Sequence, residues 1–150
     1  MEGFETDEDI LKFAIDREAK ANRFYVALAQ RMADPEMREV FEMLAQDELE
    51  HKARLELEMI KTGKVVAPEK DVNRFEAHHG PDVEPMLHMD YKNALAIGID
   101  KENASFRLYA DWMVTAKDDQ QREMLLSLAE EEAKHKARLE IEYDMLVRNQ

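Results

Sequence analysis

The chain has 150 residues, with 34 Asp and Glu against 21 Lys and Arg, a formal net charge of −13. This length fits a single domain over residues 1–150 with room for a hydrophobic core, and the acidic balance argues against nucleic acid and against anionic membrane surfaces as partners. The absence of cysteine excludes disulfides and thiolate-bound iron or zinc, and no apolar run approaches the length of a membrane span.

Capping residues and helix breakers predict four long helices. Thr6 is a candidate N-cap with Asp9 three residues on, Asp34-Pro35 ends one helix and starts the next, and Asp118 caps the last. Most Gly and Pro residues fall in one central segment, which we therefore expect to be a long crossover. The predicted fold class is an all-α four-helix bundle made of two hairpins, with helices over about 7–33, 35–61, 91–117 and 119–147 and a crossover over about 63–89.

The two halves of the chain repeat each other at an offset of 84 residues. Residues 15–59 align with 99–143 without a gap, and 18 of the 45 aligned pairs are identical. The best-matched segment runs from Glu48 to Glu56 and from Glu132 to Glu140. A repeat of this length is a unit of architecture, and each unit is interpreted as one helical hairpin.

The apolar stripe of each predicted helix is interrupted near its middle by a glutamate. In the second and fourth helices a histidine follows one turn later, as Glu-x-x-His. No Lys or Arg lies on these stripes. The interrupting residues are Glu18, Glu48, His51, Glu102, Glu132 and His135.

Buried carboxylates need a compensating charge. Each costs several kcal/mol when unpaired, and four at one level would repel one another or take up protons. Two divalent cations would balance four carboxylates and two neutral imidazoles to zero net charge. The pattern therefore predicts a metal site, although one Glu-x-x-His alone would be a weak signal and a lone histidine on an apolar face is more often a core residue.

These six residues resemble the di-iron ligand set of the ferritin-like superfamily. Within it, the segment Ile15-Asp16-x-Glu18 with Phe24-Tyr25, and the repeated Leu-Ala-x-x-Glu-x-x-His, most resemble rubrerythrin-type proteins. The resemblance covers roughly residues 8–60 and 91–147. It implies a ferritin-like fold and two bound iron ions, although manganese or a mixed pair suits the same ligands.

The resemblance also implies a role for each residue. Glu48 and Glu132 would bridge the two metals, Glu18 with His51 would complete one, and Glu102 with His135 would complete the other.

Four further residues take supporting roles by the same resemblance. Tyr25 and Tyr109, each seven residues after a ligand glutamate, would donate hydrogen bonds to carboxylates; the alternative is that they are ordinary core aromatics. Asp47 and Glu131 could orient a ligand histidine, or they could be solvated helix residues.

The chain departs from the rubrerythrin pattern in two ways. Rubrerythrins often carry an additional glutamate three residues after the third-helix ligand, where this chain has Ser105. They also commonly carry a rubredoxin-like module, which the missing cysteines exclude here. We therefore expect no ligand exchange that uses such a glutamate, and we expect electrons to come from an external donor, rubredoxin-like or another reductant.

The expected function is that of a di-iron redox enzyme that reduces hydrogen peroxide, with O₂ as the other possible oxidant. One alternative is a ferritin-like ferroxidase or iron-storage protein. The predicted fourth helix argues against it, because that helix is expected to leave no room for an additional short helix. Another is a metal-binding bundle without catalytic activity. The acidic N-terminus lacks the apolar stretch of a signal peptide, so we expect a cytoplasmic protein. We also expect a homo-oligomer, with a dimer favoured.

Overall fold

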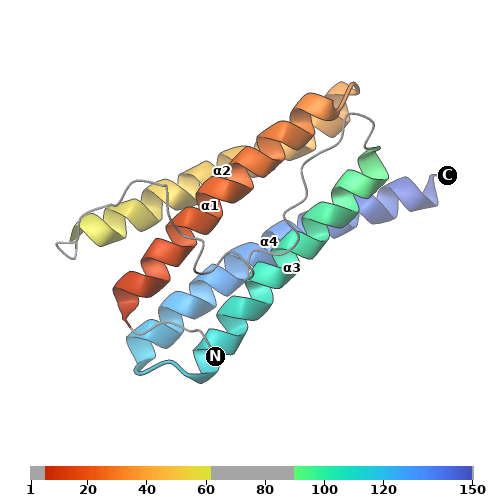
Figure 1. The fold of residues 1–150 in the computed structure, drawn as a ribbon. Coiled ribbons are helices and arrows are strands. Elements are labelled where there is room, and N and C mark those ends of the chain that lie inside the picture. The colour runs from red at the N-terminus through yellow and green to blue at the C-terminus, as the bar shows by residue number, and fades with distance from the viewer. Residues whose placement is uncertain (1–5, 62–89, 150) are drawn as a thin grey trace. The chain divides into compact units, whose positions relative to one another are not determined.

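The structure, a computed structural model, describes residues 6–61 and 90–149. Within these ranges the chain forms four α-helices and no strand (Figure 1). It divides into two compact units, the first hairpin built on α1 and α2 and the second hairpin built on α3 and α4. The helices are α1 (Asp7–Arg31), α2 (Pro35–Lys61), α3 (Tyr91–Val114) and α4 (Asp119–Arg148).

The first hairpin begins and turns at the predicted caps. Thr6 forms a capping box, in which its hydroxyl accepts from the Asp9 amide and the Asp9 carboxylate accepts from the Thr6 amide, both at 3.2 Å. Asp34 accepts from the backbone amides of Glu36 at 2.8 Å and Met37 at 3.3 Å, with Pro35 at the first helical position. Both caps are confirmed, while the crossover predicted over about 63–89 falls outside the described residues.

The second hairpin is capped by aspartates at both helix starts. Asp90 accepts from the Asn93 amide and Asp118 from the Gln121 amide, each at 2.8 Å. The third helix ends at Val114, earlier than the expected residue 117, because the backbone turns at Thr115 and Asp118 then adopts an extended conformation that a cap requires.

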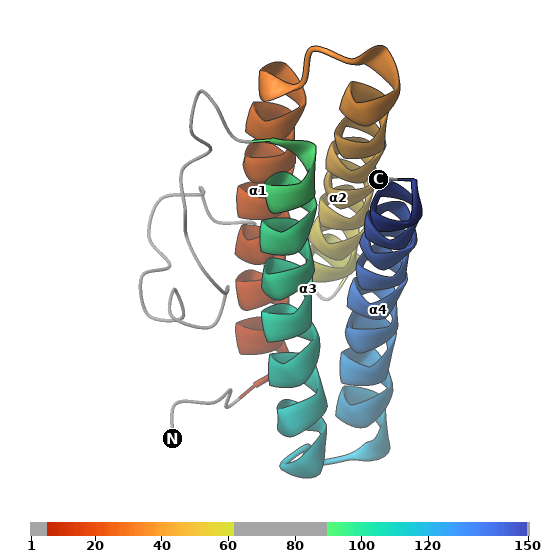
Figure 2. The same cartoon turned by 90° about the vertical axis from the view of Figure 1, so that its right-hand side faces the viewer.

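In each hairpin the two helices run antiparallel and side by side, joined by a short turn (Figures 1 and 2). Short connections favour antiparallel neighbours, as expected for helical hairpins. Large aromatic and aliphatic side chains fill the first hairpin, among them Phe13, Tyr25 and Phe41, and the second hairpin buries Tyr109 and Trp112. These apolar rows surround the buried polar residues described below.

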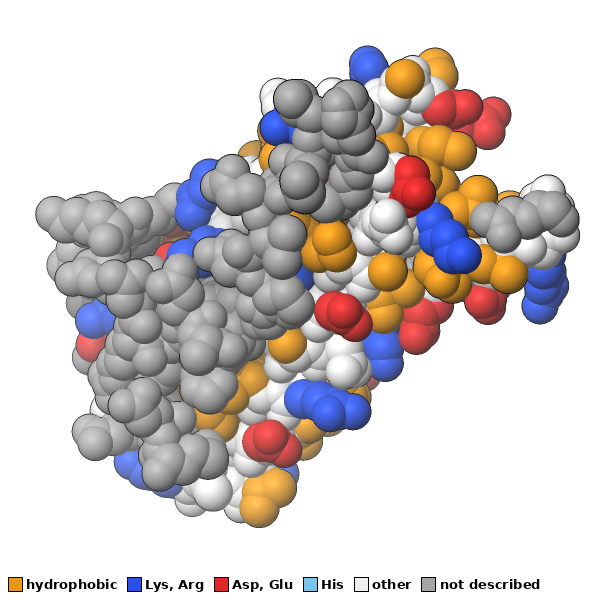
Figure 3. All heavy atoms as spheres, turned by 45° about the vertical axis from the view of Figure 1, so that its right-hand side comes forward, with side chains coloured by type: hydrophobic (Ala, Val, Ile, Leu, Met, Phe, Trp, Pro, Cys, Tyr) orange, Lys and Arg blue, Asp and Glu red, His pale blue; other side chains and the backbone are white. Residues whose placement is uncertain are grey.

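The exposed surface mixes charges of both signs. On the face drawn in Figure 3, acidic and basic side chains are interspersed with apolar ones. Among the described residues, no helix combines the length and the apolar character that crossing a membrane requires.

Candidate metal centre

The first hairpin brings three of the predicted ligands together. Glu18 comes from α1, and Glu48 and His51 come from successive turns of α2, since residues three apart share a helix face. His51 Nδ1 lies 3.6 Å from Glu18 Oε2 and 3.9 Å from Glu48 Oε1. Both glutamates are buried, at 1% and 0% exposure, and the His51 side chain is 11% exposed. Residues from two helices thus meet in one buried cluster.

A hydrogen bond fixes α1 against α2 beside this cluster. The Asn22 side-chain amide donates to the backbone carbonyl of Ala45 at 2.7 Å. Asn22 lies one turn after Glu18, and Ala45 lies one turn before Glu48. The contact therefore holds the two carboxylate-bearing turns in register, because a slip of one helix along the other would break it.

Arg17 is a buried cation in the same cluster. Its guanidinium Nη1 donates a hydrogen bond to Glu48 Oε2 and lies 3.5 Å from Glu18 Oε1. The arginine side chain is only 3% exposed. An arginine stays protonated in proteins, so it partly neutralises the two carboxylates.

The second hairpin carries the matching residues. Glu102 comes from α3, and Glu132 and His135 from α4. His135 Nδ1 lies 3.9 Å from Glu102 Oε1, and both glutamates are 0% exposed. Lys101, at the position that the repeat aligns with Arg17, is also buried at 7% exposure.

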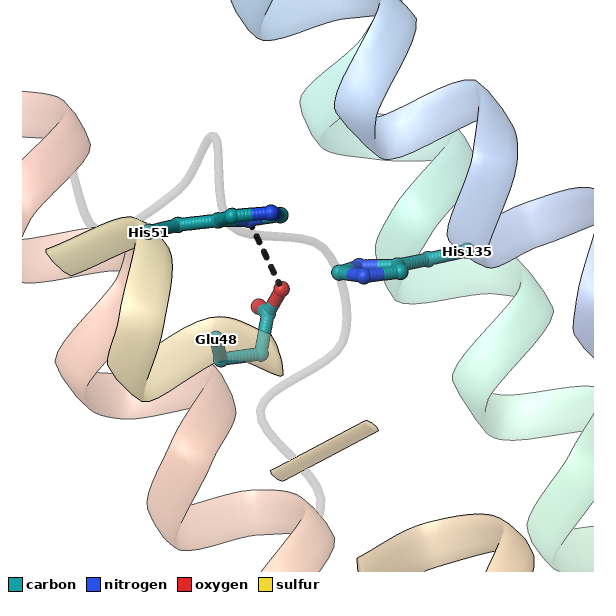
Figure 4. A group of neighbouring side chains, drawn as sticks. All are labelled: Glu48, His51 and His135. Carbon is teal, nitrogen blue, oxygen red and sulfur yellow. Dashed lines mark ion pairs between the residues drawn. The ribbon is translucent and has the colours of Figure 1, made fainter. Parts of the chain in front are cut away.

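Figure 4 shows how the α2 residues present their polar ends. Glu48 and His51 project from neighbouring turns of α2, and a dashed line marks the ion pair that the carboxylate forms with the ring. His135, drawn with its ring edge-on, extends from α4 of the second hairpin. In each hairpin the histidine ring thus reaches its polar neighbours from the helix that also carries the Glu-x-x-His glutamate.

The two predicted tyrosines are buried among aromatic rings. Tyr25 is 1% exposed, and it stacks on Phe41 with ring centroids 6.2 Å apart and meets Phe24 edge-on at 5.4 Å. Tyr109 is 0% exposed and meets Trp112 edge-on at 6.2 Å. Their expected hydrogen bonds to the ligand carboxylates stay a prediction.

The remaining predicted positions differ in exposure. Asp47 is exposed on α2, whereas Glu131 is half-buried on α4 with its carboxylate 3.8 Å from Lys134 Nζ. Ser105, three residues after Glu102, is buried at 1% exposure. The roles expected of Asp47 and Glu131 toward the histidines stay predictions.

Two buried cations, Arg17 and Lys101, were not predicted from the sequence. The predicted apolar stripes contain no Lys or Arg, so metal alone was expected to balance the carboxylates, and this balance is wrong for the first hairpin. There Glu18 and Glu48 contribute two negative charges and Arg17 one positive charge. The available signal was the repeat itself, which places a basic residue directly before both Glu18 and Glu102.

The donor atoms of the first hairpin fit a divalent metal ion. Carboxylate oxygen and imidazole nitrogen suit iron, manganese and zinc. Ligands about 2.1 Å from one ion lie at most about 4.2 Å apart, and both His51 distances, 3.6 and 3.9 Å, are within this limit. One ligand atom of Glu18 also lies within 4.8 Å of one of Glu48.

Comparisons with known proteins agree with this reading of the residues. The family model described as Rubrerythrin matches residues 9–143. A solved structure of a hypothetical protein from Pyrococcus furiosus is similar, with a TM-score of 0.71 and 24% identity over 95% of this chain and 91% of that one. No curated protein matches the chain.

The structural likeness confirms the predicted all-α, four-helix fold class. The family match reaches all four helices and includes every predicted ligand. The chain therefore belongs to the rubrerythrin family of ferritin-like di-iron proteins.

Proposed function

We propose that this protein binds two metal ions, iron in the first instance, and reduces hydrogen peroxide with electrons from an external donor. The observation that carries the proposal is the repeated buried cluster, in which a glutamate of one helix lies beside the Glu-x-x-His histidine of the next. The ligands from the first hairpin are Glu18, Glu48 and His51, and those from the second are Glu102, Glu132 and His135.

The family match supports the binding of two iron ions, because a rubrerythrin-type domain implies di-iron binding in general. Glu48 and Glu132, the glutamates of the two Glu-x-x-His motifs, would help to hold the ions. Two ferrous ions would supply the two electrons that, with two protons, convert one H₂O₂ into two water molecules, and an external donor would return two electrons.

The protein's own residues prepare the site for this chemistry. Glutamates at 0–1% exposure hold their oxygens in a dry environment, where fixed charges interact more strongly than in water. The buried Tyr25 and Tyr109 would keep ligand carboxylates oriented through their hydroxyl groups. Asn22 holds the first hairpin's two carboxylate-bearing turns in register.

The composition bears on the proposed electron donor. With no cysteine in the 150 residues, the chain has no rubredoxin-like iron site of its own. We propose a separate rubredoxin-like protein or another reductant as the electron donor, a cytoplasmic location and a homodimeric assembly. Size-exclusion chromatography checks the assembly, since a large cage would favour iron storage instead.

The test begins with metal content and proceeds to the oxidant. Protein purified without chelator, or reloaded anaerobically with Fe²⁺, should hold two metal ions per chain by elemental analysis. Stopped-flow mixing of the Fe²⁺-loaded protein with H₂O₂ and, separately, with O₂ then compares the two rates of iron oxidation. We expect the reaction with H₂O₂ to be much faster.

A pair of α2 variants provides the matched control. Glu48→Gln removes a proposed ligand carboxylate and should abolish the fast phase, whereas Glu50→Gln changes an exposed residue two positions away and should leave it intact. Preference for O₂ with continued iron uptake would favour a ferroxidase. Well under two metals per chain after Fe²⁺ addition would favour a bundle without catalytic activity and overturn the proposal.

A further inference from the structure

Arg17 and His51 lie beside different oxygens of the same two carboxylates, those of Glu18 and Glu48. Its Nη1 pairs with Glu18 Oε1 and Glu48 Oε2. The other oxygen of each carboxylate, Glu18 Oε2 and Glu48 Oε1, lies near His51 Nδ1, at 3.6 and 3.9 Å. Each glutamate therefore turns one oxygen toward a fixed cation and the other toward the imidazole that we propose as a metal ligand.

This arrangement bears directly on how Glu48 can bind metal. A carboxylate that bridges two metal ions uses both oxygens, and Glu48 Oε2 already accepts a hydrogen bond from Arg17. Metal binding through that oxygen must displace the guanidinium or share the oxygen with it. The oxygens that lie near His51 Nδ1 are instead Glu48 Oε1 and Glu18 Oε2.

The charge of Arg17 acts in the same direction. The guanidinium offsets one of the two negative charges that Glu18 and Glu48 contribute, so this pair of carboxylates attracts a divalent ion less strongly than it would without Arg17. The guanidinium cannot lose its proton to relieve this, and the cluster is nearly closed to water, with Arg17 at 3% exposure. A fixed positive charge a few ångströms away in a poorly hydrated site opposes the entry of a cation.

We propose that Arg17 is a positioning residue that holds Glu18 and Glu48 in the metal-free protein and lowers the affinity of this half of the site for divalent metal. The inference rests on the proposed function, because it requires that the same carboxylates bind metal. Arg17 replaces the metal as counter-cation when the site is empty, and it prevents repulsion between two buried carboxylates. The metal-free fold is thereby retained at the expense of metal affinity.

The repeat supplies a natural comparison for this residue. Lys101 occupies the aligned position before Glu102 and is also buried, at 7% exposure. A lysine carries a compact ammonium, whereas the planar guanidinium presents several N–H groups in a fixed fork suited to carboxylates. Arg17→Lys therefore gives the first hairpin the type of cation that the second one has.

The test measures Mn²⁺ binding to chelator-stripped protein, counting free Mn²⁺ by electron paramagnetic resonance, alongside the melting temperature without metal. Arg17→Met should bind Mn²⁺ at least tenfold more tightly in its first half-site than the unchanged protein, while its metal-free melting temperature falls. Arg17→Lys should lie between the two. Lys12→Met removes an exposed positive charge from the same helix and should leave the affinity within twofold.

The direction of the affinity change decides the result. A residue that merely maintains structure would lower the affinity when removed, so unchanged or weaker Mn²⁺ binding by folded Arg17→Met overturns the inference. If Arg17→Met does not fold without metal, Arg17→Lys decides, and affinity at or below that of the unchanged protein is the contrary outcome. Failure of the unchanged protein to bind Mn²⁺ or Fe²⁺ would instead remove the proposed function, and the inference with it.

Discussion

The two hairpins carry the same acidic and imidazole groups but surround them with different neighbours. The first has Arg17 before its α1 glutamate and Asn22 one turn later, whereas the second has Lys101 and Phe106 at the aligned positions. In the first hairpin the arginine pairs with both carboxylates and the asparagine ties the helices together. The repeat thus retains the groups that can bind metal, while the groups that hold them have diverged.

The aromatic surroundings differ in the same way. Tyr25 lies against two phenylalanines, one stacked and one edge-on, whereas Tyr109 meets the indole of Trp112. Both tyrosines are almost fully buried. Equivalent positions in a duplicated fold can therefore keep a polar group while different packing supports it.

The largest effect is expected when the ion pair between Arg17 and Glu48 in the first hairpin is removed. Glu48→Ala leaves the guanidinium of Arg17 buried without its closest partner, and removing one member of a buried pair costs about 3–5 kcal/mol. We expect the free energy of unfolding of metal-free protein, measured in urea, to fall by about this amount. Glu50→Ala, at an exposed position, is the control, and an equal loss in both variants would contradict the buried pair.

Most of the fold could be predicted from the sequence because its signals are local. Thr6, Asp34 and Asp118 each accept hydrogen bonds from the first turn of the helix that follows, a short-range contact that the residue type alone indicates. The end of α3 was less predictable. Its last turn gives way at Thr115, and no glycine marks the position.

The sequence predicted the candidate ligands of the site but not the buried cation beside them. Glu-x-x-His recurs at the repeat offset, so the pattern selects the same residue types twice. Arg17 was not predicted as a buried residue because α1 is buried on all sides from Phe13 to Ala19. A helix with no exposed face in this stretch offers no polar stripe, and tracing one apolar row at three- and four-residue steps assigns Arg17 to solvent.

A second experiment compares the two histidines. His51→Ala and His135→Ala each remove a proposed metal ligand. Loss of a residue that only hydrogen-bonds a ligand lowers metal affinity by about 10–100-fold. Loss of the ligand itself should weaken Mn²⁺ binding by more than this. Titration of chelator-stripped protein measures both. We expect the two variants to lose different ions of the pair, so that each still binds one Mn²⁺, and full two-ion binding by either variant would remove that histidine from the site.

The contact at Asn22 gives a smaller effect, confined to the first hairpin. Asn22→Ala removes the 2.7 Å hydrogen bond to the Ala45 carbonyl, and a part-buried hydrogen bond contributes about 0.5–1.5 kcal/mol. Thermal unfolding of the metal-free protein should show this loss. Gln30→Ala, an exposed position on the same helix, should change stability by less, and equal losses would show that the contact adds nothing specific.

The smallest effect concerns a pair that both hairpins share. Lys52 Nζ lies 2.9 Å from Glu56 Oε2 in α2, and its repeat partner Lys136 lies 4.0 Å from Glu140 Oε2 in α4. Exposed pairs at this spacing contribute about 0.3–0.5 kcal/mol. The closer and less exposed pair should contribute the upper part of that range, and the looser one should contribute almost nothing because water and salt screen it.

Double-mutant cycles measure this difference directly. Combining Lys52→Met with Glu56→Gln, and Lys136→Met with Glu140→Gln, isolates each pairwise term from the loss of the individual side chains. A larger coupling energy in α2, declining in high salt, is the expected result. Equal coupling in both helices would mean that the repeat has kept its surface pairs unchanged, and that the divergence between the hairpins is confined to the buried residues around the carboxylates.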